Sequence, residues 1–165
     1  MLGFIFAVLL VQSSITDPPL DQAGDWRVNE GDSGSCTAAM TYADGTVFVL
    51  SYDSHSAEGL IFLGNPRWRS VVAGQEYPFV IEMPIFGSLS LRGHGVPVDE
   101  LGGFTIPFSG VTLITRLMES DSMAIQTGRN WIGRYSLAGS YDAALELARC
   151  NRRAMDRIRP DPFAN

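Results

Sequence analysis

The sequence predicts an α+β fold that is mainly β: an antiparallel sandwich or open barrel with one inserted helix and a C-terminal helix. Short segments rich in β-branched and aromatic residues recur along the chain between clusters of Gly, Pro, Asn and Asp. Only two late segments repeat their apolar residues at helical spacing. The chain has 165 residues, 45% of them hydrophobic, and is long enough to bury a core as one domain.

The first β segments include the clearest local signal in the chain. After a short strand at Trp26–Val28, two apolar segments, Cys36–Tyr42 and Thr46–Tyr52, are separated by Ala43-Asp44-Gly45. Asp-Gly supplies the positive-φ residues that a tight turn requires, so we expect a β-hairpin here.

Further strands are expected at short intervals. They fall at Gly59–Leu63, Arg67–Val71, Tyr77–Met83, Ser88–Arg92 and Phe104–Phe108. Alternation places Trp68 towards the core and its two arginine neighbours towards water. The glycines around Gly93-His94-Gly95 and Gly102-Gly103 predict a loop-rich stretch between the last two strands.

Two helices and a closing pair of strands complete the prediction. Ser109 is expected to cap a helix over Gly110–Glu119. Ser140 is expected to cap the final helix, which starts at Tyr141 and ends before Pro160. The apolar residues at helical spacing are Leu113, Ile114, Leu117 and Met118 in the first helix, and Leu147, Cys150, Ala154 and Ile158 in the second. The strands between the helices are Ser122–Thr127 and Trp131–Leu137.

The N-terminal residues are typical of an export signal. Leu2–Val11 is an uninterrupted apolar run, much shorter than the roughly 20 residues of a membrane span. We therefore expect residues 1–13 to be a signal peptide, 14–25 a linker, 26–159 a single β-rich domain and 160–165 a tail. A buried first strand is the alternative. Export predicts a periplasmic or secreted protein, with no stable membrane span in the mature form.

The two cysteines support export. Cys36 and Cys150 lie near the two ends of the predicted domain, and an even pair in an exported protein predicts a disulfide. The alternative is two unrelated buried thiols. The bond would join the last helix to an early strand.

Charge excludes nucleic acid as a partner. All 12 basic residues are Arg, against 18 acidic residues, and the net charge is −6. A surface that binds phosphates needs a positive field. The partners to expect are proteins or other components of the cell envelope.

Two sequence patterns that include Asp32-Ser33-Gly34 are similar to protease motifs, but their context does not fit either family. Gly31-Asp32-Ser33-Gly34 resembles the nucleophile segment of chymotrypsin-like proteases, but in that family the histidine precedes the serine, and both histidines here follow it. Asp32-Ser33-Gly34 with Trp131–Arg134 resembles the retropepsin pattern, but no apolar strand precedes the aspartate. We interpret Glu30–Ser35 as a turn.

The histidines carry the remaining enzymatic hypothesis. His94 lies between two glycines, and His55 follows Asp53 by two residues. A hydrolase using His94 or His55 with a carboxylate such as Asp53 or Asp99 is therefore the alternative function. The spacings match no metal site and no phosphate-binding loop, so we expect no metal, no cofactor and no catalytic residue.

Aromatic and apolar residues suggest two binding surfaces. Eight aromatic side chains could form either a ligand groove or an ordinary β core: Trp26, Trp68, Trp131, Phe48, Phe62, Phe79, Phe104 and Phe108. A carrier of a small apolar ligand would need an enclosed cavity. The run Pro78–Leu91 carries Glu82 as its only charge and would suit a partner-facing edge if exposed.

The C-terminal third carries a family resemblance. Met123–Gln126, Ile132–Ser140, Ala143–Leu145 and Cys150 resemble the closing pattern of small exported alphaproteobacterial proteins, including relatives of the invasion-associated locus B family. The resemblance implies a periplasmic β-rich domain and no catalytic residues. We therefore expect an exported, non-enzymatic domain that binds or supports another envelope component.

Overall fold

A single antiparallel sheet forms most of the molecule, confirming the mainly β prediction. The computed structural model describes residues 25–31, 35–53 and 56–158. The predicted signal peptide, most of the linker and the tail lie outside them. The nine strands are β1 Arg27–Glu30, β2 Cys36–Thr41, β3 Val47–Asp53, β4 Glu58–Asn65, β5 Glu76–Met83, β6 Gly87–Val98, β7 Leu101–Ser109, β8 Ser122–Thr127 and β9 Asn130–Ser136. The helices are α1 Thr112–Glu119 and α2 Ser140–Ile158.

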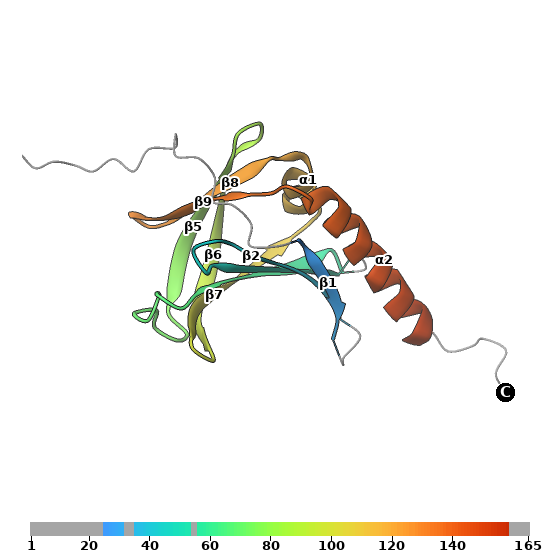
Figure 1. Cartoon of the computed structure of the whole chain (residues 1–165), viewed down its shortest axis with the longest axis horizontal. Coiled ribbons are helices and arrows are strands. Elements are labelled where there is room, and N and C mark those ends of the chain that lie inside the picture. Colours follow the sequence, from blue (N-terminus) through green and yellow to red (C-terminus); the bar gives the residue numbers. More distant parts are fainter. Residues whose placement is uncertain (1–24, 32–34, 54–55, 159–165) are drawn as a thin grey trace, which may run out of the picture.

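The sheet curls into an open barrel. Its strand order is β1-β2-β3-β4-β7-β6-β5-β8-β9, so the two edge strands are β1 and β9. Figure 1 shows the first strands and the last strands facing each other across the interior, with α1 and the β8–β9 turn at opposite ends. The right-handed twist of strands favours such curling in a sheet of this many strands.

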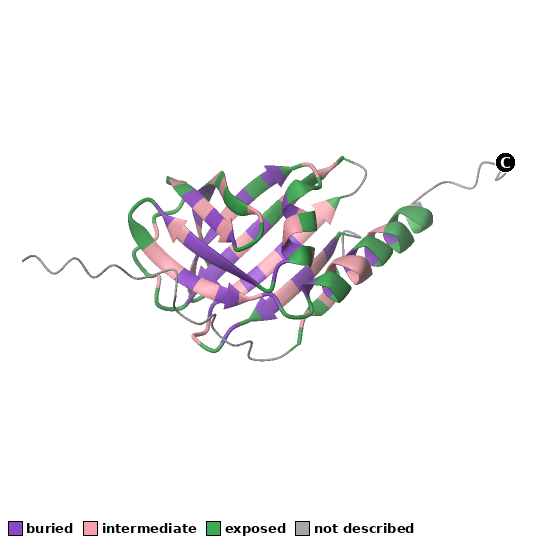
Figure 2. Cartoon of the chain, turned by 90° about the horizontal axis from the view of Figure 1, so that it is seen from above, coloured by how far each residue is buried: buried purple, intermediate pink, exposed green. Residues whose placement is uncertain are grey.

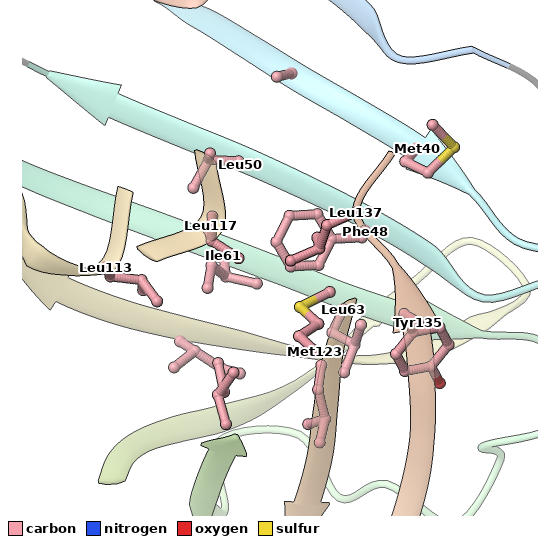
Figure 3. Close-up of a cluster of buried hydrophobic side chains, with 14 of the residues drawn as sticks. Met40, Phe48, Leu50, Ile61, Leu63, Leu113, Leu117, Met123, Tyr135 and Leu137 are labelled. Atoms are coloured by element: carbon pink, nitrogen blue, oxygen red, sulfur yellow. The ribbon is translucent and has the colours of Figure 1, made fainter. Parts of the chain in front are cut away.

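Alternating side chains along each strand fill the interior of the barrel. Buried positions in β2, β3 and β5 recur every second residue, and β4 follows the same alternation up to Leu63 before ending in two further buried residues. α1 closes one end by inserting Leu113 and Leu117 among them. Figure 3 shows these two leucines beside Ile61, Met123 and other core residues contributed by several strands.

The predicted β2–β3 hairpin is confirmed, and its turn is held by polar contacts. Gly45 has φ +84°, the left-handed conformation that glycine adopts without strain. The Asp44 carboxylate accepts hydrogen bonds from the backbone N–H of Thr46 at 2.9 Å and from its hydroxyl at 2.9 Å. The buried Asn65 amide donates to the Thr46 hydroxyl at 2.9 Å, which ties the turn to the end of β4.

The final helix is bonded to the sheet by the predicted disulfide. Cys36 in β2 and Cys150 in α2 are joined, with their Cα atoms 6.0 Å apart. The buried face of α2 also carries Ala143, Leu147 and Ala154, and its other side is exposed (Figure 2). α2 packs against β1, β2 and α1, so it lies over the region where the two edges of the sheet approach each other.

The predicted strand at Arg67–Val71 is wrong. This segment belongs to a loop between β4 and β5, folded by backbone bonds from Trp68 N–H to the Asn65 carbonyl and from Val71 N–H to the Trp68 carbonyl. No strand forms a ladder with it among the described residues. The predicted directions of the side chains are still correct: Trp68 is half-buried against the core, whereas Arg69 is exposed.

The predicted loop-rich stretch around the glycines is also wrong. Gly93 and Gly95 lie inside β6, and Gly102 and Gly103 lie inside β7. Close packing explains these glycines: a Cβ on Gly102 would lie 1.8 Å from the Trp68 carbonyl oxygen, and a Cβ on Gly95 would lie 2.2 Å from the Val72 carbonyl oxygen. The glycines admit the β4–β5 loop onto the sheet.

Both predicted serine caps are wrong. Ser109 ends β7, and α1 begins at Thr112 after Val111, without a side-chain cap. Gly110, with φ +79°, turns the chain between them. Ser140 lies within α2, and its hydroxyl donates to the Leu117 carbonyl at 2.7 Å. The serine therefore joins the two helices, a long-range contact that local sequence does not reveal.

Candidate functional site

The pairing of β6 with β7 stops halfway along β6. The ladder runs from Val98 opposite Leu101 to His94 opposite Thr105 and ends there. On its other edge β6 remains paired with β5 from His94 to Gly87. The segment Gly87–Gly93 therefore has a partner strand on one edge only among the described residues. Figure 1 shows the β5–β6 hairpin as the green ribbon with its turn at the top.

The direction of the backbone groups along this segment follows from Gly95. Its N–H donates to the Gln75 carbonyl at 2.9 Å and its carbonyl accepts from Gly74 at 2.8 Å, so both groups point towards β5. Backbone groups of successive strand residues point to opposite edges. The N–H and C=O groups of Ser88, Ser90 and Arg92 therefore point away from β5, into the gap beside β7.

Pro107 explains why the ladder ends at this point. In continued register the next hydrogen-bonded pair after His94 and Thr105 would join Arg92 to Pro107. Proline has no backbone N–H, so the Arg92 carbonyl would find no donor there. On its other edge Pro107 lies opposite Leu60 in β4, at a position where the ladder requires no donor from it. Proline thus interrupts one ladder and leaves the other intact.

The gap between β6 and β7 is a groove of about 550 Å³ with an apolar floor. Residues of β5, β6 and β7 and the start of α1 line it: Pro78, Phe79, Val80, Leu89, Ser90, Leu91, Arg92, Pro107, Phe108, Ser109, Thr112 and Leu113. Arg92 is its only charged residue, and its guanidinium group donates to the Glu76 carboxylate. We call this feature the strand-edge groove. It combines unpaired backbone groups with an apolar surface.

The predicted partner-facing edge at Pro78–Leu91 overlaps this groove. β5 within that run is paired on both edges, with β6 and with β8. Only the β6 part, from Gly87 onwards, has an edge towards the groove. The low charge of this run leaves both the edge and the floor of the groove almost without charged side chains.

The predicted aromatic residues do not form one groove. Trp68, Phe104 and Trp131 line a second pocket of about 280 Å³ near the β8–β9 turn. Trp26 lies elsewhere, packed edge-on against Phe48 and hydrogen-bonded to the Ala138 carbonyl. We call the second feature the aromatic pocket.

The histidine sites expected for a hydrolase are not assembled around His94. His94 is exposed on β6, and no hydrogen bond joins it to a carboxylate or hydroxyl among the described residues. Asp99 lies in the β6–β7 turn with φ +51°. His55 lies outside the described residues. Asp53 ends β3, and its carboxylate accepts a hydrogen bond from the Ser56 hydroxyl at 3.0 Å.

The protease-like segment at residues 31–35 is only partly described. The N–H of Gly31 donates to the Ser35 carbonyl at 2.8 Å, which fits the predicted turn, and residues 32–34 lie outside the described part. In the other half of the retropepsin-like pattern, Trp131 lies in β9 beside the aromatic pocket. The Arg134 side chain donates to the Ser122 hydroxyl at 3.0 Å.

Polar bonds close the barrel where β9 approaches the first strands. The Tyr42 hydroxyl donates to the Ser136 carbonyl at 3.0 Å, and the Tyr42 and Tyr135 rings lie 4.7 Å apart. Burial raises the pKa of Tyr135 to about 12; the Thr46 hydroxyl bonded to it opposes that rise, and nearby Asp44 adds to it. Burial also raises the pKa of Tyr42. Both phenols are therefore held neutral.

Two further searches cover the described residues. No three side chains of His, Cys, Asp or Glu lie together there as a metal ion would require. Neither of the two described helices is long and apolar enough to cross a membrane.

Comparison with known proteins returned no match to a protein family, to a curated protein or to a solved structure. The resemblance to the invasion-associated locus B family therefore remains a prediction.

Pro107, the residue that defines the strand-edge groove, lies within the predicted strand Phe104–Phe108, which β7 confirms. A proline favours extended backbone at the residue before it, so it agrees with that prediction. Its effect on pairing depends on which edge its nitrogen faces. To know which edge the nitrogen faces, one needs the register of β7 with β4 and β6, and the sequence alone does not give this register.

Proposed function

We propose that this chain is an exported, non-enzymatic domain that binds an extended segment of another envelope protein at the free edge of β6. The observation that carries the proposal is the strand-edge groove, where Ser88, Ser90 and Arg92 present backbone groups for which the described part of the chain offers no partner strand. An extended peptide satisfies such groups by adding a strand.

The side chains of the groove define the kind of segment that fits. Leu89 and Leu91 alternate with the edge residues and face the interior side of the wall, next to Phe108 and Leu113. A strand that pairs with β6 would place every second side chain on this floor. We therefore expect apolar residues at alternating positions. The only charged residue of the groove, Arg92, is paired with Glu76, so an uncharged segment fits best.

Export is supported by the disulfide. Cys36 and Cys150 are bonded across 114 residues of sequence, and such bonds persist in oxidising compartments. The test is to trap free thiols in intact cells of the source organism with an alkylating reagent and to fractionate the cells. Export predicts unlabelled cysteines and a periplasmic or secreted protein. Labelled cysteines in a cytosolic fraction would overturn the export proposal.

The binding proposal is tested with a displayed library of random peptides selected on the oxidised protein. Ser90→Pro removes the N–H that faces the groove and breaks no bond to β5, whereas Ser90→Ala keeps that N–H. Selected peptides should alternate apolar residues and should bind S90P at least about tenfold more weakly, the loss expected for a strand-pairing contact. The S90A variant should bind normally.

Two results would contradict the binding proposal. One is selection of peptides without alternation that bind S90P as tightly as the original protein. The other is peptide binding that leaves the amide resonances of Ser88, Ser90 and Arg92 unchanged while shifting those of a distant surface.

A further inference from the structure

The aromatic pocket is separate from the strand-edge groove and has different chemistry. No residue lines both features. The β4–β5 loop, Tyr77 of β5, Phe104 of β7 and residues of the β8–β9 hairpin surround the aromatic pocket. Phe104 is buried at its base, with the Trp68 ring 5.7 Å and the Tyr77 ring 5.0 Å away between centroids. Trp131, half-buried, lines the side formed by β9.

Several hydrogen-bonding groups of the pocket lack partners. Thr127 is 8% exposed, and its buried hydroxyl has no hydrogen-bond partner in the structure. Leaving a buried hydroxyl unpaired is costly. No hydrogen bond involves the indole N–H of Trp68 or of Trp131 among the described residues, whereas the indole N–H of Trp26 is bonded to the Ala138 carbonyl. Asn130 and Ser70 add further polar side chains to the lining.

The pocket carries no free charge. Its one ionic residue is Arg67, and the guanidinium group of Arg67 lies 3.2 Å from the Asp44 carboxylate and also donates to the Asp44 carbonyl. An anionic ligand would have to compete with the Asp44 carboxylate for Arg67. A cationic ligand would find no carboxylate in the lining of the pocket to pair with. Charge complementarity therefore favours a neutral ligand.

The lining also excludes a purely apolar ligand. An alkyl chain or an aromatic hydrocarbon would cover the indole N–H groups without bonding them, which adds a desolvation cost, and it would leave the buried Thr127 hydroxyl unpaired. A ligand with an apolar C–H face and hydroxyl groups around its edge satisfies both the rings and the polar atoms. A pyranose ring has this arrangement. The pocket volume of about 280 Å³ suits a single small ligand.

We propose that the aromatic pocket binds a neutral sugar ring, stacked between the Trp68 and Trp131 side chains and hydrogen-bonded to Thr127 and Asn130. This site goes beyond the proposed function and is independent of it. A protein with such a site could recognise a neutral saccharide while the other end of the barrel holds a peptide.

The test is an NMR titration of the oxidised full chain with glucose, galactose, mannose and N-acetylglucosamine. The three tryptophans give three indole N–H signals. We expect at least one sugar to bind with a millimolar Kd and to shift the signals of Trp68 and Trp131, with Trp26 as the internal control. Octanoate and indole serve as control ligands with large apolar surfaces and no ring of hydroxyl groups.

Variants distinguish binding from a general loss of structure. Thr127→Val removes the unpaired hydroxyl without removing any bond of the protein, so its Tm should not fall. Its sugar affinity should be about three- to tenfold weaker, the range for one hydrogen bond. Trp26→Phe, outside the pocket, should keep full affinity.

Three results would overturn the sugar proposal. The first is that none of the four sugars shifts the Trp68 or Trp131 signal at 50 mM, a concentration that corresponds to a binding free energy of roughly −2 kcal/mol if taken as the Kd. The second is that octanoate or indole shifts these signals and none of the sugars does. The third is that the Thr127→Val variant binds the sugar as tightly as the original protein. None of these results bears on the strand-edge groove.

Discussion

The hydrogen-bonded wall of this barrel is interrupted at two places, which differ in the contacts that join their two sides. Between β9 and the first strands there is no backbone ladder, yet side chains and α2 bridge the gap. Between β6 and β7 the ladder stops at His94, and beyond it no hydrogen bond or disulfide joins the two strands among the described residues. We call these the closed seam and the open seam.

The closed seam is built from specific bonds between side chains and backbone carbonyls and from the disulfide. The Tyr42 hydroxyl bonds the Ser136 carbonyl, the Trp26 indole bonds the Ala138 carbonyl, and the disulfide fixes α2 over the same region. At the open seam, Pro107 removes a donor and Arg92 and Ser90 direct their backbone groups into the gap. The bonds of the closed seam stabilise the barrel, whereas the open seam is where we propose that a peptide binds.

Removing the disulfide should have the largest effect on stability. The bond closes a loop of 114 residues, and the chain-entropy relation gives about 4–5 kcal/mol for such a loop, with smaller measured values common. The double variant Cys36→Ala, Cys150→Ala should therefore unfold at a clearly lower urea concentration. A loss below about 1 kcal/mol would mean that α2 does not depend on the bond and that the closed seam is held by other contacts.

Proline substitutions on β6 should separate its two edges. Leu89→Pro removes an N–H that faces β5, and we expect a loss of about 3 kcal/mol or more. Ser90→Pro removes an N–H that faces the open seam, and we expect a loss below about 1 kcal/mol. Urea unfolding of both variants measures the difference. Equal losses would show that the edge facing β7 is paired.

Alkaline pH should weaken the closed seam. The folded-state pKa of Tyr135 is raised to about 12 and that of Tyr42 is raised as well, so each tyrosine stabilises the folded state fully below pH 10. That contribution is lost as pH rises from 10 towards 12. The expected loss is about 1.4 kcal/mol per tyrosine by pH 11.

Urea unfolding between pH 8 and 11.5 measures this loss. Tyr135→Phe is the matched variant, because it removes one titrating group and should roughly halve the pH dependence. A free energy of unfolding that stays constant over this range would contradict the buried, neutral state of the two phenols.

The smallest effect is expected from the exposed ion pair of Arg157 and Glu30. The Arg157 guanidinium group donates to the Glu30 carboxylate at the far end of α2, where solvent screens both groups. Glu30→Gln should leave the urea midpoint unchanged within error. A marked decrease in the urea midpoint would show that a surface ion pair also stabilises the closed seam, which would then depend on more than the bonds named above.

Sequence reasoning succeeds where structure is decided by neighbouring residues. Asp44-Gly45 determines the β2–β3 turn through a positive φ and an Asp side chain that bonds its own loop. The disulfide was predicted from the number and compartment of the cysteines, and the final helix from its 3.6-residue periodicity.

Sequence reasoning fails where contacts with a distant segment of the chain determine the local structure. Gly95 and Gly102 are strand residues because the β4–β5 loop lies against them, and their local pattern alone is typical of loops. The segment Arg67–Val71 alternates like a strand but has no partner strand among the described residues. The same limit applies to the candidate sites, because Pro107 and Thr127 acquire their significance only from register and burial.

The most direct test of the account is hydrogen exchange along β6. Leu89, Leu91 and Gly93 direct their amides towards β5, whereas Ser88, Ser90 and Arg92 direct theirs into the open seam. NMR-detected exchange of the oxidised protein should therefore alternate, with slow exchange at the first three residues and near-unprotected exchange at the other three. Strong protection of Ser90 and Arg92 equal to that of Leu89 and Leu91 would contradict an unpaired edge.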